Sequence, residues 1–568
     1  MPRPHSGYRT ALALLLGLVL VLTGCSAIPR SGPVQALQVE NGAESQGSTF
    51  SPPGPKVDAN PREIIEGFIE AGIAPQDDYK VAREFLNPKQ SGVWKGAVQT
   101  LVYDARPSVI PGAKDNTYTI QLEVVSQIDA NGVKTELPPH STRAVDMTLE
   151  KLDGQWRISG LPDGTMIDRD SFDGLFAAQP IYFYDATYHY AVPDMRWFPK
   201  RTGLAAAMVE ALLKGPAGYL ENAVVSAFPS GSSLARSAVP IESQRATVDL
   251  NSATFIDATE LSRQQMQQQL DLTLKGLSGI RTVVMTDEQR EVKLGPPDPQ
   301  FVTAQVNAPV PDTQIGIVDQ TLYYVKGKSI SRVAIDDISG YDPRDPAMSP
   351  LGNRYAFLDG TFTRLFTVDD QGHSRIVATG SALVRPSIDA SGWTWTADHT
   401  GKTRILAVPE DTALNGKVRP IAADWLNDSS VSSIRISRDG ARALIVSSKR
   451  GVSTVSISGI LRDSDGTPRG FATPMHLYPS VPVTRAVWDS DSSIIVAASD
   501  PTERVEAERI NLGGKPEKFQ PLLGMVGLSA GPGERRPVFA ETTDKLYTRV
   551  GNSWHKMEES ARDLSYPG

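Results

Sequence analysis

The sequence has a single cysteine among its 568 residues and no excess of basic side chains. One cysteine cannot form an intramolecular disulfide, and a thiolate zinc site usually takes two or more. Acidic side chains outnumber basic ones, 65 to 57, which gives a formal net charge of −8. Because no basic excess is available to neutralise a phosphate backbone, nucleic acid is not an expected partner. The length and the 40% of hydrophobic residues still predict several globular domains.

The sequence also lacks a long hydrophobic run at its start. Residues 11–22 are apolar and follow a basic segment with Arg3 and Arg9, which is typical of a secretory signal peptide. A permanent membrane span is the alternative, but such a span needs about 18 to 20 apolar residues. The signal ends in Leu22-Thr-Gly-Cys25, which resembles the lipobox of bacterial lipoproteins.

The resemblance to a lipobox implies a role for Cys25. In such lipoproteins the signal is cut before the matching cysteine, here between Gly24 and Cys25. The cysteine sulfur then carries diacylglycerol, and the freed amine is acylated, for example with palmitate. Two or three acyl chains on one residue make membrane attachment stable, so we expect Cys25 to hold the protein at the extracytoplasmic face of the cell membrane. A cysteine that follows an ordinary signal peptide by chance is the alternative.

Groups that would indicate an enzyme or a cofactor are scarce. No histidine stands at a metal-binding spacing, and the sequence contains no nucleophile elbow, phosphate-binding glycine loop or dinucleotide fingerprint. The segment Asp463-Ser-Asp-Gly466 resembles the opening of a calcium loop but lacks the later ligands, which favours a hairpin turn. Trp393 and Trp395 alternate along one strand, and core packing is favoured over a ligand platform. The sequence therefore predicts no catalytic residue, metal or cofactor.

The first folded part follows a stretch rich in Ser, Gly and Pro, which is expected to be a flexible tether. Order is predicted to begin at Asn60, which can cap a helix while Glu63 reaches back to the cap. A second short helix is expected around residues 81–86. Four strands should then follow at residues 98–103, 117–125, 141–149 and 155–158. This unit is α+β and similar in size to NTF2-like domains.

A second α+β unit follows. Its expected elements are strands at 181–184, 246–250 and 281–285, a helix over 204–213 capped by Thr202, and a helix over 266–277. The glutamine-rich residues 264–269 are expected to form a solvated helix face. Several segments resemble the GerM-type domain of sporulation and germination proteins, namely Tyr182-Phe183, Val192-Pro193 with Arg196, 211–216, Phe228-Pro229, 248–250 and 269–274. In that family the domain is taken as an envelope interaction module and not as an enzyme.

After residue 297 short strand-like runs and turns replace helix periodicity. Turn segments recur about every 40 to 50 residues, as in the four-stranded blades of a propeller, at 349–352, 387–392, 437–440, 488–492 and 529–533. We expect about five or six blades, with a pair of β-sandwiches as the alternative. The predicted fold class is thus multidomain, with two small α+β domains followed by an all-β propeller. The predicted divisions are a signal peptide at 1–24, a lipid-anchored tether at 25–59, the N-terminal domain at 60–177, the GerM-like domain at 178–297 and the propeller at 298–568.

This order of parts resembles the LpqB family of lipoproteins over essentially the whole chain. The resemblance implies a partner, because proteins of that family act with the sensor histidine kinase MtrB, contact its extracellular domain and modulate signalling to the response regulator MtrA. We therefore expect a membrane-anchored accessory regulator of a two-component system, without catalysis of its own. A receptor for an envelope ligand such as a peptidoglycan fragment is the alternative, and a propeller hydrolase or lyase is less favoured.

Overall fold

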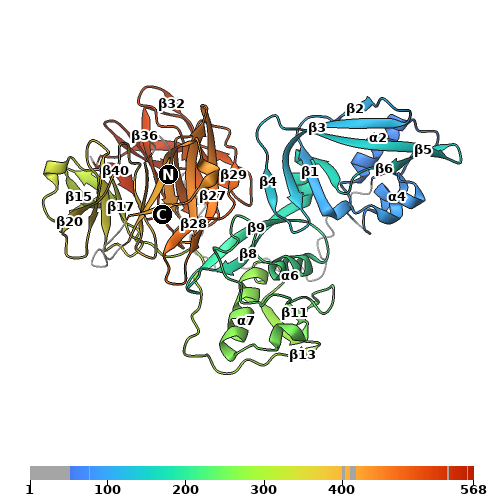
Figure 1. The fold of residues 1–568 in the computed structure, drawn as a ribbon, viewed down its shortest axis with the longest axis horizontal. Coiled ribbons are helices and arrows are strands. Elements are labelled where there is room, and N and C mark those ends of the chain that lie inside the picture. The colour runs from blue at the N-terminus through green and yellow to red at the C-terminus, as the bar shows by residue number, and fades with distance from the viewer. Residues whose placement is uncertain (1–51, 76, 399–402, 410–417, 534–535, 559–560) are drawn as a thin grey trace, which may run out of the picture. The chain divides into compact units, whose positions relative to one another are not determined.

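A computed structural model describes residues 52–568, apart from residues 76, 399–402, 410–417, 534–535 and 559–560. Figure 1 shows an N-terminal α+β domain in blue, a second α+β domain in green and an all-β domain in yellow to red. The predicted fold class is confirmed. The lipidation site Cys25, the cleavage position after Gly24 and most of the tether lie outside the described residues. Within the described ranges, no helix has the length and apolar character needed to cross a membrane.

The N-terminal domain begins with the predicted capped helix. The Asn60 side chain accepts a hydrogen bond from the Glu63 N–H, and the Glu63 carboxylate accepts one from the Asn60 N–H, which completes a capping box. Ile64, Ile65 and Phe68 form the buried stripe of this helix. The helices of the domain are α2 (Pro61–Ala71), α3 (Lys80–Glu84), α4 (Pro88–Val93) and α5 (Arg169–Leu175).

The sheet of this domain has the strand order β6-β5-β3-β1-β7, and β2 and β4 also pair with β3. Its strands are β1 (Gln99–Tyr103), β2 (Ser108–Pro111), β3 (Thr117–Asp129), β4 (Lys134–Glu136), β5 (Thr142–Leu152), β6 (Gln155–Gly160) and β7 (Thr165–Asp168). All four predicted strands are present, as β1, β3, β5 and β6. Ile120 and Leu122 of β3 share one core with α2. The parallel pairing of β1 with β7 was not predicted, because the sequence between them does not show which strands become neighbours.

Residues 52–59, which the sequence assigns to the tether, lie against the N-terminal domain. The Asp58 N–H donates to Gln155 Oε1 at 2.8 Å, and Gln155 Nε2 donates to Asp58 Oδ1 at 2.9 Å. Ala59 is buried. These residues are small or polar, so hydrophobic patterning does not reveal that they are fixed to β6.

The second domain combines a hairpin, two helices and a four-stranded sheet. Its elements are β8 (Phe176–Tyr184), β9 (Ala191–Pro199), α6 (Leu204–Lys214), β10 (Ile241–Glu242), β11 (Arg245–Leu250), α7 (Glu260–Leu274), β12 (Thr282–Asp287) and β13 (Arg290–Glu291). Strands β8 and β9 pair antiparallel, and the sheet has the order β10-β11-β12-β13. Leu212 of α6 and Leu270 of α7 are fully buried in one core, as their spacing predicts.

Two sequence predictions for this domain are wrong. The N-cap of α6 is Gly203, with φ 84°, and not Thr202, because glycine adopts this left-handed conformation without steric cost. The glutamine-rich segment is not a purely solvated face, because Gln269 is fully buried. Its Nε2 donates to the Tyr182 carbonyl and its Oε1 accepts from the Ala227 N–H, both at 2.8 Å. A paired buried amide of this kind ties α7 to β8.

The third domain is a propeller whose described residues form six blades, within the predicted five or six. The two-sandwich alternative is excluded, since the inner strands contact one another in a closed ring of β40, β17, β21, β25, β30 and β36. Blade 1 is completed by β40 (Arg562–Ser565), which pairs antiparallel with β14 (Gln314–Val318). Its outer strands are β15 (Thr321–Lys326) and β16 (Ser329–Arg332).

The other five blades follow the chain order. Blades 2 and 3 contain β17 (Arg344–Met348), β18 (Tyr355–Leu358), β19 (Arg364–Val368), β20 (Ser374–Thr379), β21 (Ser387–Ile388), β22 (Thr394–Asp398), β23 (Arg404–Val408) and β24 (Arg419–Ile421). Blade 4 contains β25 (Ser430–Ile436), β26 (Arg442–Lys449), β27 (Val452–Arg462), β28 (Pro468–Phe471) and β29 (Met475–Leu477). Blades 5 and 6 contain β30 (Arg485–Ser490), β31 (Ser493–Ala497), β33 (Ala507–Asn511), β34 (Glu517–Lys518), β36 (Met525–Ala530), β37 (Val538–Thr542), β38 (Leu546–Val550) and β39 (Ser553–Lys556). Strands β32 (Arg504–Val505) and β35 (Leu522–Leu523) form a separate pair.

Candidate functional site in the propeller

An arginine and an aspartate four residues apart recur in the segments of three inner strands. The segments Arg385–Asp389, Arg435–Asp439 and Arg485–Asp489 share the pattern Arg-x-x-x-Asp and begin 50 residues apart. They run through β21, β25 and β30, the inner strands of three consecutive blades. Because equivalent strands of neighbouring blades run alongside one another, the arginines gather at one end of the ring and the aspartates at the other.

The arginine end contains a pocket of about 270 Å³. Its charged lining consists of Asp345 from blade 2 and of Arg385, Arg435 and Arg485. The remaining lining consists of serine and threonine residues and of apolar residues, from the inner strands β25, β30 and β36 and from neighbouring loops. The pocket therefore combines a charged region with an apolar wall.

Arg385 is the paired arginine of this pocket. Its Nη2 lies 2.5 Å from Asp345 Oδ1, and its Nε donates to the same oxygen at 2.6 Å. A second carboxylate, that of Asp563, lies 3.6 Å from Nη2. Burial would raise the pKa of Asp345, but the guanidinium of Arg385 and the other nearby arginines outweigh burial and lower it. Asp345 is therefore an ionised partner of Arg385.

Arg435 and Arg485 lack such a partner. Arg435 is 5% exposed, and its Nη1 donates to the Pro386 carbonyl at 2.7 Å. Among the described residues, no carboxylate oxygen lies within 4 Å of either guanidinium. Burial, together with the positive charges of Arg385 and Arg485, lowers the pKa of Arg435 to about 9. Since this value is still above neutral pH, the pocket holds an excess of positive charge.

At the opposite end of the same strands, each aspartate has an arginine of its own. The three ion pairs are Asp389–Arg462 at 2.5 Å, Asp439–Arg442 at 2.6 Å and Asp489–Arg509 at 3.0 Å. The aspartates also close the turn that follows each strand. In blade 3, Asp389 Oδ1 accepts the N–H groups of Ser391 and Trp393, each at 2.9 Å. An aspartate suits this position because its carboxylate can accept hydrogen bonds from the backbone N–H groups of the turn.

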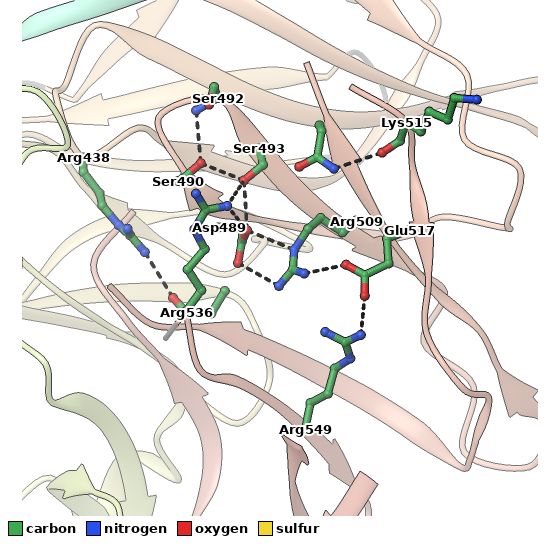
Figure 2. A network of polar contacts seen from close by, with 12 residues as sticks. Arg438, Asp489, Ser490, Ser492, Ser493, Arg509, Lys515, Glu517, Arg536 and Arg549 are labelled. Atoms are coloured by element: carbon green, nitrogen blue, oxygen red, sulfur yellow. Dashed lines mark hydrogen bonds and ion pairs between the residues drawn. The ribbon is translucent and has the colours of Figure 1, made fainter. Parts of the chain in front are cut away.

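Figure 2 shows the network around Asp489. Asp489 Oδ2 accepts a hydrogen bond from Ser493 Oγ at 2.9 Å and lies 3.4 Å from Arg536 Nη1. Arg509 extends the network to Glu517 at 2.6 Å. The carboxylate of Asp489 is fully buried and is surrounded by these donors. These contacts neutralise the buried carboxylate of Asp489 and hold the arginines of the blade in place.

The other sequence-predicted positions do not form a second site. Trp395 is fully buried and donates to Asp389 Oδ2 at 2.9 Å, which confirms core packing. Asp463 and Gly466 close the hairpin between β27 and β28, so the favoured turn is confirmed as well. In the part of the chain that the structure describes, no three His, Cys, Asp or Glu side chains could hold a metal ion.

The pocket arginines were missed at the level of the sequence. The turns that hold the aspartates are recognisable as a repeat, but the arginine four residues before each aspartate was not recognised as part of it. The common spacing of 50 residues in Arg385, Arg435 and Arg485 is the signal that identifies them.

Three family models match the chain. Residues 54–173 match the N-terminal domain of lipoprotein LpqB, residues 180–293 match a domain of sporulation and spore germination proteins, and residues 320–567 match the beta-propeller domain of lipoprotein LpqB. The first match includes residues 54–59, in agreement with the contacts of Asp58 described above.

Curated relatives align along most of the sequence. Lipoprotein LpqB of Streptomyces avermitilis is 25% identical, and the alignment covers 97% of this chain and 96% of that protein. Lipoprotein LpqB of Bifidobacterium longum is 28% identical, with 88% and 87% covered.

Solved structures show weaker similarity. TolB from Acinetobacter baumannii has 14% identity and a TM-score of 0.34, covering 45% of this chain and 65% of that one. The tandem GerMN domains of GerM from Bacillus subtilis have 19% identity and a TM-score of 0.19, covering 26% and 59%. The family assignment therefore rests on the family models and the curated relatives. Because two LpqB models match opposite parts of the described chain and the relatives align along nearly its whole length, the chain belongs to the LpqB family of lipoproteins.

Proposed function

We propose that the chain is a lipid-anchored accessory regulator that binds the extracellular domain of an MtrB-like sensor histidine kinase and modulates signalling to MtrA. The observation that carries the proposal is a lipobox ending at Cys25 in front of domains of the LpqB family. A regulator of this kind must bind one signalling state of the kinase more tightly than the other, because equal affinity shifts no equilibrium. A difference of about 1 to 3 kcal/mol changes the population of the active state several-fold or more.

The test uses the full chain and the full-length kinase in the same lipid vesicles. Increasing amounts of the lipoprotein are expected to change kinase autophosphorylation and phosphate transfer to MtrA several-fold, with saturation. The lipidated protein heated to unfold it serves as the control. Unchanged phosphorylation at a molar excess of the folded lipoprotein contradicts the proposal.

The proposed anchor makes a separate prediction. In Cys25→Ala the sulfur that accepts diacylglycerol is absent, so incorporation of labelled palmitate is expected to be lost and the precursor to keep its signal peptide. Alkaline washing should then release much more of the variant than of the wild type from membranes, because a short apolar stretch binds less strongly than two or three acyl chains. The control is Ser26→Ala, which retains the cysteine. Continued palmitate labelling of Cys25→Ala contradicts this assignment.

A receptor for an envelope ligand is a second candidate function, favoured by the pocket with two unpaired arginines. A propeller hydrolase is less favoured. The pocket lining includes one carboxylate, Asp345, which is already paired with Arg385, and no histidine or cysteine. This lining supplies positive charge for binding but no second group to share acid and base roles. We therefore propose a binding role and not a catalytic one.

A further inference from the structure

The pocket of the propeller carries more positive than negative charge. Arg385, Arg435 and Arg485 line it together with a single carboxylate, that of Asp345. Two further carboxyl groups lie nearby, those of Asp563 and Glu541, and both interact with Arg385. Among the described residues, Arg435 and Arg485 have no carboxylate oxygen within 4 Å, and Asp345 attracts both of them only from a longer distance. Like charges that are removed from water without a counter-charge repel one another and are costly to keep.

The repeated Arg-x-x-x-Asp segments do not force charged groups to lie together without counter-charges. At the other end of the same strands the fold neutralises every repeated aspartate, and Arg442 shows how a structural arginine is held there. Its Nη2 lies 2.6 Å from Asp439 Oδ2, and its Nη1 donates to the Asp491 carbonyl at 2.6 Å. Arg435 differs from Arg442, because its one hydrogen bond goes to the carbonyl of Pro386. Its remaining N–H donors are available in the pocket.

We propose that this pocket binds a compact oxyanion, a carboxylate or a phosphoryl group, between Arg435 and Arg485. A guanidinium can donate two parallel N–H bonds to such a group, which gives both strength and orientation. A bound oxyanion would supply Arg435 and Arg485 with the direct ion pair that, among the three pocket arginines, the described residues provide only to Arg385. Hydroxyl groups of Ser432 and Thr484 line the same pocket and can add donors.

The apolar residues of the pocket indicate which kind of oxyanion it can hold. Phe362, Leu383 and Leu528 are among the apolar residues that line the pocket, whose volume is about 270 Å³. A small organic acid fits this lining, with its oxyanion on the arginines and its apolar part on the wall. Inorganic phosphate would use the charged region alone. Binding of an oxyanion in this pocket does not depend on whether the chain binds a kinase.

The first experiment titrates the full lipidated chain in detergent with sodium propionate and, separately, with sodium phosphate. Chloride keeps the ionic strength constant, and both the heat of binding and the unfolding temperature are measured. A single saturable site is expected, with an unfolding temperature that rises with occupancy. Tighter binding of propionate than of phosphate supports the contribution of the apolar wall, and binding of phosphate alone supports the oxyanion site without it. Absence of saturable binding by both probes overturns the proposal.

Substitutions of the pocket arginines test whether the anion binds between them. Arg435→Gln and Arg485→Gln are each expected to raise the dissociation constant about tenfold or more, the loss expected for a charge-assisted hydrogen bond. Arg485→Gln should change the unfolding temperature without the anion only slightly, because it breaks no hydrogen bond found in the structure and removes repulsion from Arg435 together with attraction to Asp345 and Asp563. The matched control is Arg469→Gln, since this arginine is 56% exposed and pairs with Asp463 at 3.7 Å, outside the pocket. Unchanged anion binding in both pocket variants, or a much lower unliganded unfolding temperature in Arg485→Gln, contradicts the proposal.

Discussion

Replacing Arg442 with alanine is expected to destabilise the propeller by about 3 to 5 kcal/mol. Arg442 is fully buried, and its guanidinium carbon lies 4.9 Å from the centre of the Trp488 ring. The substitution removes the positive partner of Asp439, whose carboxylate is also buried, and therefore leaves a negative charge inside the domain without compensation. Chemical denaturation of the full chain, followed by tryptophan fluorescence, measures the effect as a lower unfolding midpoint.

The control for Arg442 is an exposed ion pair. Lys449 lies 3.9 Å from Asp428, and their side chains are 52% and 85% exposed. Lys449→Ala should change the stability by less than about 1 kcal/mol, since water screens such pairs. In addition, the double variant Arg442→Met with Asp439→Leu should recover part of the loss, because it removes both buried charges together. Equal midpoints for Arg442→Ala and the wild type would show that the buried pair does not stabilise the fold.

The second large effect depends on pH and arises at Glu541. Burial and the neighbouring carboxylate of Asp563 raise the pKa of Glu541 from 4.5 to about 7, although the backbone N–H groups of Asp563 and Leu564 donate to it. The folded state therefore holds a proton that the unfolded state releases. The resulting stabilisation is complete below pH 4.5 and is lost as the pH rises to about 7. At about 1.4 kcal/mol per pKa unit, the loss is about 3 kcal/mol.

Glu541→Gln separates this contribution from other titrations. The amide has the shape of the protonated carboxyl group but does not titrate, so the free energy of unfolding should fall less steeply between pH 4.5 and 7 than in the wild type. A smaller slope should remain, because burial and the neighbouring Asp439 raise the pKa of Asp491 to about 6. Parallel pH profiles of the variant and the wild type would exclude Glu541 as the source.

Local signals in the sequence predicted much of the fold. The capping box at Asn60 was predictable because its two hydrogen bonds join residues three apart, and it is present in the structure. The propeller was predictable because short turn segments recur about every 40 to 50 residues, and in some of them an aspartate such as Asp389 accepts backbone N–H groups. Both features depend only on residues that are close in the sequence.

The candidate site depends on residues far apart in the sequence, and this is why its parts were missed. Arg435 has no unusual neighbours in its own strand, and its environment arises only when blades 3 and 5 bring Arg385 and Arg485 beside it. The buried Gln269 is a similar case. Its partners Tyr182 and Ala227 lie on other elements, so an analysis of helix faces assigns the side chain to solvent.

The closure of blade 1 has a consequence for biogenesis. Strand β40 completes a sheet whose other three strands, β14, β15 and β16, are made before the remaining five blades. During synthesis and export, those blades can form their hairpins as they emerge, while the edge of β14 stays unpaired until β40 arrives. An unpaired edge invites pairing with other chains, so β14 is the exposed edge of the ring until β40 is in place. A product truncated before residue 562 lacks β40 and therefore has an open ring with an unpaired β14 edge.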